Sequence, residues 1–345
     1  MVSKKIPARA ATMEDVAKKA GVAISSVSRA LSDHPDVSES LKKKVTEAAK
    51  KLRFEPNLLA SSLRSGSTKT VGFIVRDFSS PLFSLIAKGA DEVLREHGYL
   101  LLLTNSDGDT DIEVAHINLL ARRRVDGIIA SLISETDTKM LEALGQFKGQ
   151  VVVLDREISG LTASFIQIDH RSGVRDAVRH LLQLGHRNIA LITGPITVRA
   201  GRERLRGVQD AFKEIGLQFN EEYLKAGSYL PGFAEKAILE LFSGNLRPTA
   251  IIAGGVQSTE GALRGIRSLG LKVGHDVSFV ACDEVPFLEL SWPPISVVSR
   301  DPYSFGRASA QVLLDAIEAH SPQIQVLSTR YIARASSVPN FNPQS

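Results

Sequence analysis

The chain of 345 residues contains a single cysteine, Cys282, and only 6% aromatic residues. One cysteine excludes an internal disulfide and is typical of a protein kept in a reducing compartment. No apolar run is long enough to span a bilayer, and the N-terminus shows no stretch like a signal peptide. We therefore expect a cytoplasmic protein with no membrane partner.

Signatures of enzymes are also missing. The sequence has no HExxH, GxSxG, Walker A or GxGxxG motif, and its eight histidines lack the spacing of metal ligands. A nucleotide-dependent dehydrogenase would need a glycine fingerprint after the first strand, but residues 71–79 contain only one glycine, Gly72. We predict no catalytic residues, no metal site and no cofactor, and that the protein is not an enzyme.

Positive charge is concentrated in the first fifth of the chain. Residues 1–70 contain fourteen Lys or Arg against seven Asp or Glu, a net charge of +7, whereas the other 275 residues have a net charge of −3. Such segregation is the electrostatic footprint of a nucleic-acid-binding module.

The basic segment contains the pattern of a helix-turn-helix. Thr12 can cap a helix over residues 13–20, and Gly21 suits the turn that follows. A second helix would turn its apolar side chains toward the first. Its outer face would then present a narrow ridge made of Ile24, Ser25, Ser26, Ser28 and Arg29. Such a ridge fits a major groove, where Arg29 can read guanine and the serines can bond base edges or phosphates.

These two helices alone could also form an amphipathic hairpin with a solvated face. A third helix over 38–52, opened by Ser38, favours the DNA-binding interpretation because it allows a small three-helix core to be buried. Its outer face is basic and contains Lys42, Lys43, Lys44, Lys50 and Lys51.

The run from Thr12 to Gly66 resembles the DNA-binding headpiece of the LacI/GalR transcriptional regulators, through its DVAKKAGV, SSVSRAL and HPDVSESLKKKVTEAAKKL segments. The resemblance implies a hinge helix after Pro56, whose copies pair in the minor groove while Leu63 wedges between base pairs. The alternative is that Leu58, Leu59 and Leu63 are ordinary core of a linker helix. The DNA-binding residues that we predict from the headpiece and hinge are Thr12, Ile24, Ser25, Ser26, Ser28, Arg29, Ser38, Asn57, Leu58, Ala60 and Leu63.

Two departures from the family pattern weaken the predicted DNA affinity. Ala23 stands where the family usually has a serine cap, the loss of which costs about 0.5–2 kcal/mol, and Ser25 could partly substitute. Ser61 and Ser62 replace a long basic or amide side chain of the hinge.

From Thr70 onward, short apolar runs alternate with amphipathic helices, which predicts parallel sheets with right-handed crossovers. About 275 residues exceed the usual size of one core, so two α/β lobes are expected. The candidate strands cover residues 70–76, 99–104, 127–131, 150–154, 165–168, 188–193, 249–253, 277–282 and 295–299.

This part resembles the family's ligand-binding core, which is shaped like a periplasmic sugar-binding protein and crosses between lobes three times. We place the crossings near residues 169, 300 and 329. The predicted fold class is an all-α helix-turn-helix headpiece with a hinge helix, followed by a two-lobed α/β core of parallel sheets. The predicted domains are a headpiece (10–54), a hinge and linker (55–68) and a core (69–345), with an N-lobe of 69–168 and 301–328 and a C-lobe of 169–300 and 329–340.

Ligands of open parallel sheets bind beyond the carboxyl ends of the strands. Asp155 and Asp283 each close a strand pattern, and Phe83 follows the first one. By resemblance, Arg204 and Asp283 are the main ligand contacts, followed by Asp155, Phe83 and Tyr229. The alternatives are a structural pair for Arg204 with Asp283, and a strand-end cap for Asp155.

The pattern favours a carbohydrate over a purine as the ligand. Leu82 and Arg156 occupy positions that are aromatic in the purine-binding branch of the family, while Arg199 and Arg202 leave room for an acidic sugar or a sugar phosphate. Gly255-Val256 replaces the usual Asn-Asp, so one polar contact is absent.

We therefore expect a transcriptional repressor that binds a palindromic operator in double-stranded DNA as a homodimer under control of a small effector. Inducer and corepressor both fit. The tail after Arg334 has no leucine heptad that would form a tetramer. A secreted solute-binding protein, the main rival, should have a signal peptide and no basic headpiece.

Overall fold

The computed structural model describes residues 11–31, 36–54, 66–244 and 246–340. The chain divides into two compact units, Met1–Thr68 and Lys69–Ser345, which are described separately. No helix of the described residues is long and apolar enough to cross a membrane.

The first unit contains three short helices, α1 (Met13–Ala20), α2 (Ile24–Leu31) and α3 (Glu39–Leu52). Thr12 and Asp15 form a reciprocal capping box at the start of α1, and Gly21 ends this helix in the left-handed conformation. Buried apolar residues of all three helices form one small core: Val16, Ala17, Ala20, Val27, Ala30, Val45, Ala48 and Ala49. The helix-turn-helix and third helix therefore form as the sequence predicts.

The second unit contains two six-stranded sheets. The N-lobe sheet has the order β11-β5-β4-β3-β1-β2, and all its neighbouring strands are parallel. Its strands are β1 (Thr70–Val75), β2 (Leu100–Asn105), β3 (Gly127–Ala130), β4 (Gln150–Leu154), β5 (Ser164–Ile168) and β11 (Ile324–Leu327).

The C-lobe sheet has the order β12-β10-β9-β8-β6-β7 and is parallel except that β12 runs antiparallel to β10. Its strands are β6 (Ile189–Thr193), β7 (Leu224–Ala226), β8 (Ala250–Gly254), β9 (Ser278–Cys282), β10 (Ser296–Ser299) and β12 (Arg330–Ile332).

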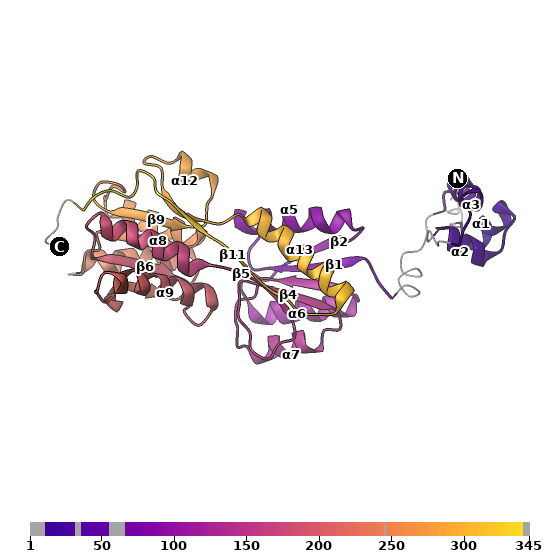
Figure 1. Ribbon diagram of the computed structural model, residues 1–345, viewed down its shortest axis with the longest axis horizontal. Helices are drawn as coiled ribbons and strands as arrows, with labels where there is room; N and C mark the ends of the chain where they lie inside the picture. Colours follow the sequence, from indigo (N-terminus) through magenta and orange to yellow (C-terminus); the bar gives the residue numbers. More distant parts are fainter. Residues whose placement is uncertain (1–10, 32–35, 55–65, 245, 341–345) are drawn as a thin grey trace, which may run out of the picture. The chain divides into compact units, whose positions relative to one another are not determined.

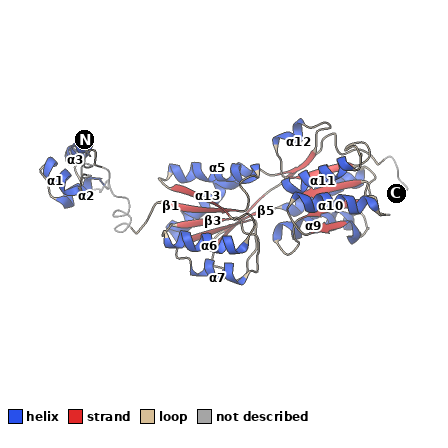
Figure 2. Ribbon diagram, turned by 180° about the vertical axis from the view of Figure 1, so that it is seen from behind, coloured by secondary structure: helices blue, strands red, loops and turns tan. Residues whose placement is uncertain are grey.

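Helices cover both faces of each sheet (Figures 1 and 2). Alternate residues of β1 point to opposite cores, because Phe73 packs with α5 (Pro81–Glu96) and α13 (Pro302–Ala319), and Ile74 packs with α6 (Thr110–Arg122) and α7 (Thr138–Gln146). The C-lobe sheet is enclosed by α8 (His170–Gln183) and α9 (Arg199–Glu214) on one face and by α10 (Pro231–Ser243) and α11 (Val256–Ser268) on the other. The remaining elements are the 3-10 helix η1 (Glu221–Tyr223) and α12 (Pro286–Leu290).

The chain passes between the two sheets three times, after Ile168, after Ser299 and after Leu327. Each passage joins the end of a strand in one lobe to the start of an element in the other. The carboxyl ends of both parallel sheets therefore face the boundary between the lobes, where polar residues at strand ends can meet.

The predicted alternation of strand and helix in parallel sheets is wrong at two places. Nine residues without a helix connect β4 to the parallel strand β5, and β12 is antiparallel. The strands β7, β11 and β12 have no counterpart in the sequence prediction. They are three or four residues long, lie at sheet edges and are not buried, so they lack the continuous apolar pattern that identified the inner strands.

Helices α5 and α13 cross at close range through two glycines. A Cβ atom added at Gly306 would lie 1.9 Å from the carbonyl oxygen of Ile86, and one at Gly89 would lie 2.2 Å from that of Tyr303. Only glycine permits this approach. The contact fixes α13, which follows the second passage between lobes, on the N-lobe.

Candidate functional site

The outer face of α2 presents the residues predicted to read DNA. Ile24 is 49% exposed, Ser25 and Arg29 are exposed, and Ser26 and Ser28 are partly buried. Val27 and Ala30 of the same helix are buried in the headpiece core. The side chains that the sequence analysis placed outside thus form one surface strip, as a recognition helix requires.

Thr12 and Ser38 each cap a helix. The Thr12 hydroxyl donates to Asp15 Oδ2 at 2.7 Å and accepts from the Asp15 amide at 3.3 Å, and the Ser38 hydroxyl accepts from the Leu41 amide at 3.4 Å. Helix N-termini are sites that favour phosphate, so both positions suit the predicted backbone contacts. The hinge positions Asn57, Leu58, Ala60 and Leu63 lie outside the described residues.

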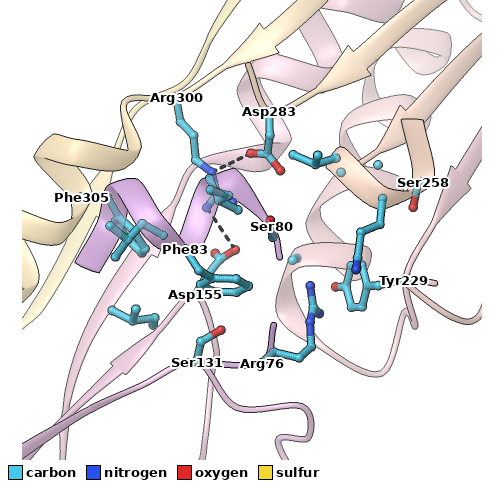
Figure 3. A pocket seen from close by; sticks show the side chains of 18 of the residues that line it. Arg76, Ser80, Phe83, Ser131, Asp155, Tyr229, Ser258, Asp283, Arg300 and Phe305 are labelled. Atoms are coloured by element: carbon cyan, nitrogen blue, oxygen red, sulfur yellow. Dashed lines mark hydrogen bonds and ion pairs between the residues drawn. The ribbon is translucent and has the colours of Figure 1, made fainter. Parts of the chain in front are cut away.

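The five predicted ligand residues of the core line a single cavity of about 60 Å³ between the lobes: Phe83, Asp155, Arg204, Tyr229 and Asp283. Figure 3 shows the side chains around it, which come from both lobes. Gly194 makes room for the Tyr229 ring, because a Cβ atom at Gly194 would lie 2.2 Å from that ring. The structure therefore brings together residues that are distant in the sequence.

Both cavity aspartates directly follow a buried strand, Asp155 after β4 and Asp283 after β9. Their φ angles are 53° and 73°, a left-handed conformation that costs energy for residues other than glycine. The turn directs both carboxylates into the space between the lobes, as Figure 3 shows. Such strain is concentrated at functional sites.

Asp155 is held by protein groups at both of its oxygens. Oδ2 lies 2.7 Å from His170 Nε2, while Oδ1 accepts from the Ile168 amide at 3.3 Å and from Arg199 Nη1 at 3.4 Å. Burial alone would raise the pKa of Asp155, but His170 and the nearby Arg300 hold it well below its usual value. Asp155 is therefore an ionised residue that ties β4 and β5 to α8 and α9.

Asp283 has one engaged oxygen and one that faces the cavity with a weaker contact. Oδ1 accepts from Arg300 Nε at 2.6 Å, and Oδ2 lies 3.9 Å from Arg204 Nη2. Burial opposes ionisation of Asp283, but Arg300 and Arg204 lower its pKa below the usual value. Oδ2 remains able to accept a hydrogen bond from a ligand hydroxyl.

Arg204 is only 2% exposed, yet its Nε and Nη1 atoms have no hydrogen-bond partner among the described residues. The Tyr229 hydroxyl and the Ser258 hydroxyl, which line the same cavity, are also buried without a partner there. Buried polar groups are almost always satisfied in native proteins, so a group of donors without protein partners around one cavity marks a place where a polar ligand can bind.

Sequence reasoning missed two cavity arginines, Arg76 and Arg300, and noted Arg156 only as a departure from the family pattern. All three line the cavity, and all three follow the carboxyl end of a strand by one or two residues. The rule that identified Asp155 and Asp283 could therefore have found them as well. An arginine after a strand is, however, usually read as a solvated residue.

The expectation that Arg199 and Arg202 leave room for an acidic ligand is wrong, because neither lines the cavity. Arg199 Nη1 donates to the Ile168 carbonyl at 2.7 Å. Arg202 donates to Glu135 at 3.1 Å and to Glu157 at 3.0 Å, across the boundary between the lobes. These two arginines bind the lobes to each other.

A helix-turn-helix unit joined to a two-lobed α/β unit with a polar cavity between its lobes defines a class of protein, the ligand-binding transcriptional regulators. Residues 12–57 match the model of the bacterial regulatory proteins of the lacI family, and residues 178–337 match that of the periplasmic binding protein-like domain. The chain belongs to the LacI family of bacterial transcriptional regulators.

Curated relatives and solved structures agree with this membership. The chain is 31% identical over 320 residues to the HTH-type transcriptional repressor PurR of Edwardsiella ictaluri (strain 93-146), with 92% of this chain and 93% of the relative covered. It is 28% identical to the transcriptional regulator CelR in its cellobiose complex, with a TM-score of 0.71 and coverage of 94% and 99%. The lac repressor dimer bound to operator and the anti-inducer ONPF has the same fold, with a TM-score of 0.82, 24% identity and coverage of 96% and 100%.

The protein is therefore a DNA-binding transcriptional repressor of this family with an effector-binding core, and not an enzyme.

Proposed function

We propose that the protein represses transcription by binding a palindromic operator as a homodimer, and that a sugar, sugar acid or sugar phosphate in the cavity between the lobes changes its DNA affinity. In this proposal Ile24, Ser25, Ser26, Ser28 and Arg29 contact bases and phosphates, and Leu63 enters the minor groove. Arg204 and Asp283 are the central effector contacts.

One observation supports the effector site above all others. Arg204 is buried with two unsatisfied donor nitrogens, and the Asp283 carboxylate beside it has one oxygen that lacks a close partner. A donor and an acceptor side by side fit the hydroxyl-rich edge of a sugar, while Phe83 and Tyr229 offer aromatic surface to its apolar face.

The relatives named PurR make a purine base the second candidate effector. Phe83 could stack on such a base, and Tyr229 and Phe305 also line the cavity, but Leu82 and Arg156 stand where the purine-binding branch of the family has aromatic residues. We rank the purine below the carbohydrate on this ground.

A group of exposed apolar residues on the C-lobe supports the proposal of a homodimer. Within six residues, Phe287, Leu290 and Trp292 are 49%, 84% and 96% exposed. Large apolar side chains gathered in one exposed place mark an interface for another protein, and a second copy of the chain is the partner that a palindromic operator requires.

The experiment has two stages. Selection from a random duplex library with the full-length protein should enrich a near-palindromic site, and a non-repeating site would contradict the dimer. A thermal-shift screen of sugars, sugar acids, sugar phosphates and nucleobases should then yield a compound that raises Tm and alters operator binding.

Asp283→Asn should abolish the effector response in the same operator-binding assay, because the amide removes the negative charge and replaces one acceptor oxygen with a donor. The control is Asp276→Asn, a change at a C-lobe residue that does not line the cavity. A full response by Asp283→Asn would move the effector site elsewhere.

A further inference from the structure

Three arginines meet at the cavity from separate elements. Arg76 follows β1, Arg156 follows Asp155 at the end of β4, and Arg204 lies on α9 of the other lobe. Burial lowers the pKa of Arg76, and the charges of Arg156 and Arg204 lower it further, whereas Tyr229 and Asp77 act in the opposite direction. The three guanidinium groups therefore repel one another in a buried place, an arrangement that needs a compensating anion.

The carboxylates of the cavity do not supply that compensation. Asp283 is paired with Arg300, and Asp155 is bonded by His170 and Arg199. Among the described residues, neither Arg76 nor Arg156 has a carboxylate within ion-pair distance. Arg76 instead stacks 4.2 Å from the centre of the Tyr229 ring, visible in Figure 3.

Another acid that interacts with the cluster is Glu113 on α6, which lies within reach of the charges of Arg156 and Arg76. Burial raises the pKa of Glu113 to about 7, so a large part of it is protonated at neutral pH. Its Oε1 atom accepts from the Ile133 amide and the Ser106 hydroxyl, not from an arginine. The lining of the cavity contains four arginines, Arg76, Arg156, Arg204 and Arg300, against two carboxylates, Asp155 and Asp283. It therefore has an excess of about two positive charges, which Asp77 and Glu113 offset only in part.

The donors around these charges are unsatisfied. Arg156 is 4% exposed, and its Nε atom has no hydrogen-bond partner within the described part of the chain. The same is true of Arg204 Nε and Nη1, and of the Tyr229 and Ser258 hydroxyls. Several convergent donors with two excess charges match a phosphate monoester, which has about −1.5 to −2 charges at pH 7 and three acceptor oxygens.

We propose that Arg76, Arg156 and Arg204 form a subsite for a phosphoryl group, and that the effector is a phosphorylated metabolite. This inference rests on the proposed function and narrows its effector class. A carboxylate has one charge and two oxygens, so it would leave part of the cluster uncompensated.

A second cavity has room for the rest of such an effector. It measures about 490 Å³, against about 60 Å³ for the inner one, and the two share Arg76, Tyr229 and Gln257. Ligand sites of small molecules usually measure about 300–1,000 Å³. The inner cavity therefore has room for a phosphoryl group, and the outer cavity has room for the rest of the effector. Asp77 and Asp107 line the outer cavity. Carboxylates accept from hydroxyls and repel phosphate, so they orient a phosphorylated sugar with its phosphate inward.

The test is calorimetric titration of the full-length protein with inorganic phosphate and with matched pairs, ribose against ribose 5-phosphate and glucose against glucose 6-phosphate. We expect saturable binding of inorganic phosphate and tighter binding of at least one sugar phosphate than of its free sugar. Titration with gluconate tests whether a carboxylate can replace the phosphate group of the ligand.

Arg156→Gln should weaken the binding of inorganic phosphate about tenfold, because one charge-assisted contact is lost. The ligand-free variant should melt no lower than the parent protein, because a repulsive buried charge is removed. Arg76→Gln is a second variant with the same expectation. Arg264→Gln, at an exposed arginine paired with Glu260, is the control and should bind phosphate like the parent.

The subsite is overturned if inorganic phosphate and the sugar phosphates fail to bind while a free sugar, gluconate or a nucleobase binds and alters operator affinity. That result would leave the proposed function intact. A lower melting temperature of Arg156→Gln and Arg76→Gln with unchanged phosphate binding would assign both arginines a structural role. If no compound of any class binds or affects the operator complex, the proposed function itself fails.

Discussion

The ionised side chains around the cavity between the lobes differ in how many of their polar atoms have a bonding partner. Asp155 is bonded at both oxygens, Asp283 at one, and Arg204 lacks partners at two nitrogens. A buried residue with complete bonding holds the fold, whereas one with incomplete bonding has capacity for a ligand. At the residue scale, this difference separates structural from ligand-binding groups in one cluster.

Glu113 gives this region a pH dependence. Its pKa is about 7 in the folded protein against an ordinary value of 4.5, so the folded state holds a proton that the unfolded state releases between these pH values. The contribution of Glu113 to stability therefore falls as the pH rises from about 4.5 through 7. Glu113→Gln should flatten this dependence and raise the free energy of unfolding at pH 8 by on the order of 2–3 kcal/mol.

Urea unfolding of parent and variant at pH 5 and pH 8 measures this effect. The difference between the two proteins should be larger at pH 8. Glu142→Gln, at another acid of the N-lobe, is the control and should leave the profile of the parent unchanged. Equal stabilities of the parent and Glu113→Gln at pH 8 would contradict the shifted pKa.

The cavity residues show how far single positions could be predicted. Asp155 and Asp283 follow unmistakable buried strands, and the rule for the carboxyl ends of parallel strands places them together. The pairing of Asp155 with His170, and of Arg202 with Glu135, depends on how two lobes meet. No spacing within one element encodes such contacts, so the roles of Arg199 and Arg202 were misjudged.

At the scale of elements, the N-terminus of α9 is capped by a residue of the opposite lobe. No side chain of its own first turn caps it, but Glu135 Oε1, from the loop after β3, accepts from the Arg199 amide at 2.7 Å. Glu135 Oε2 accepts from Arg202 at 3.1 Å. A carboxylate at a helix N-terminus is stabilised by the helix dipole. Because α9 also contains Arg204, this contact from the N-lobe helps to position a proposed effector residue.

Glu135→Gln should therefore weaken this contact between the lobes. Loss of the charge facing the helix end and Arg202 should lower the free energy of unfolding by about 1–2 kcal/mol and weaken effector binding in parallel. Glu157→Gln is the matched control, because its carboxylate is 62% exposed, touches the same Arg202 and should contribute less than about 1 kcal/mol. Urea unfolding and calorimetric titration measure both quantities. Equal losses in the two variants would contradict a special role of Glu135.

Elements were predictable to the extent that they are buried. The inner strands β3, β4, β8 and β9 are continuous apolar runs, and their bounds lie within one residue of the predicted ones. The edge strand β12 is exposed and forms only because β10 offers it an open edge. Its existence depends on tertiary contacts, which local patterns do not encode.

At the scale of the whole molecule, the exposed apolar group on and after α12 predicts how the chain associates. Leu290→Glu places a charge amid Phe287 and Trp292, and burying it in an interface would cost several kcal/mol. We expect the parent to sediment as a dimer at micromolar concentration and the variant as a monomer. Because a dimer joins two half-sites, the monomer should also lose about 100-fold or more in operator affinity.

Leu239→Glu is the control, since this leucine on α10 is 39% exposed and lies on a different element. It should keep the parent's sedimentation and operator affinity. A dimer of Leu290→Glu with full affinity would show that the apolar group serves another partner. A monomeric Leu290→Glu that still bound the whole operator with parental affinity would instead contradict twofold recognition, because one headpiece would then suffice for both half-sites.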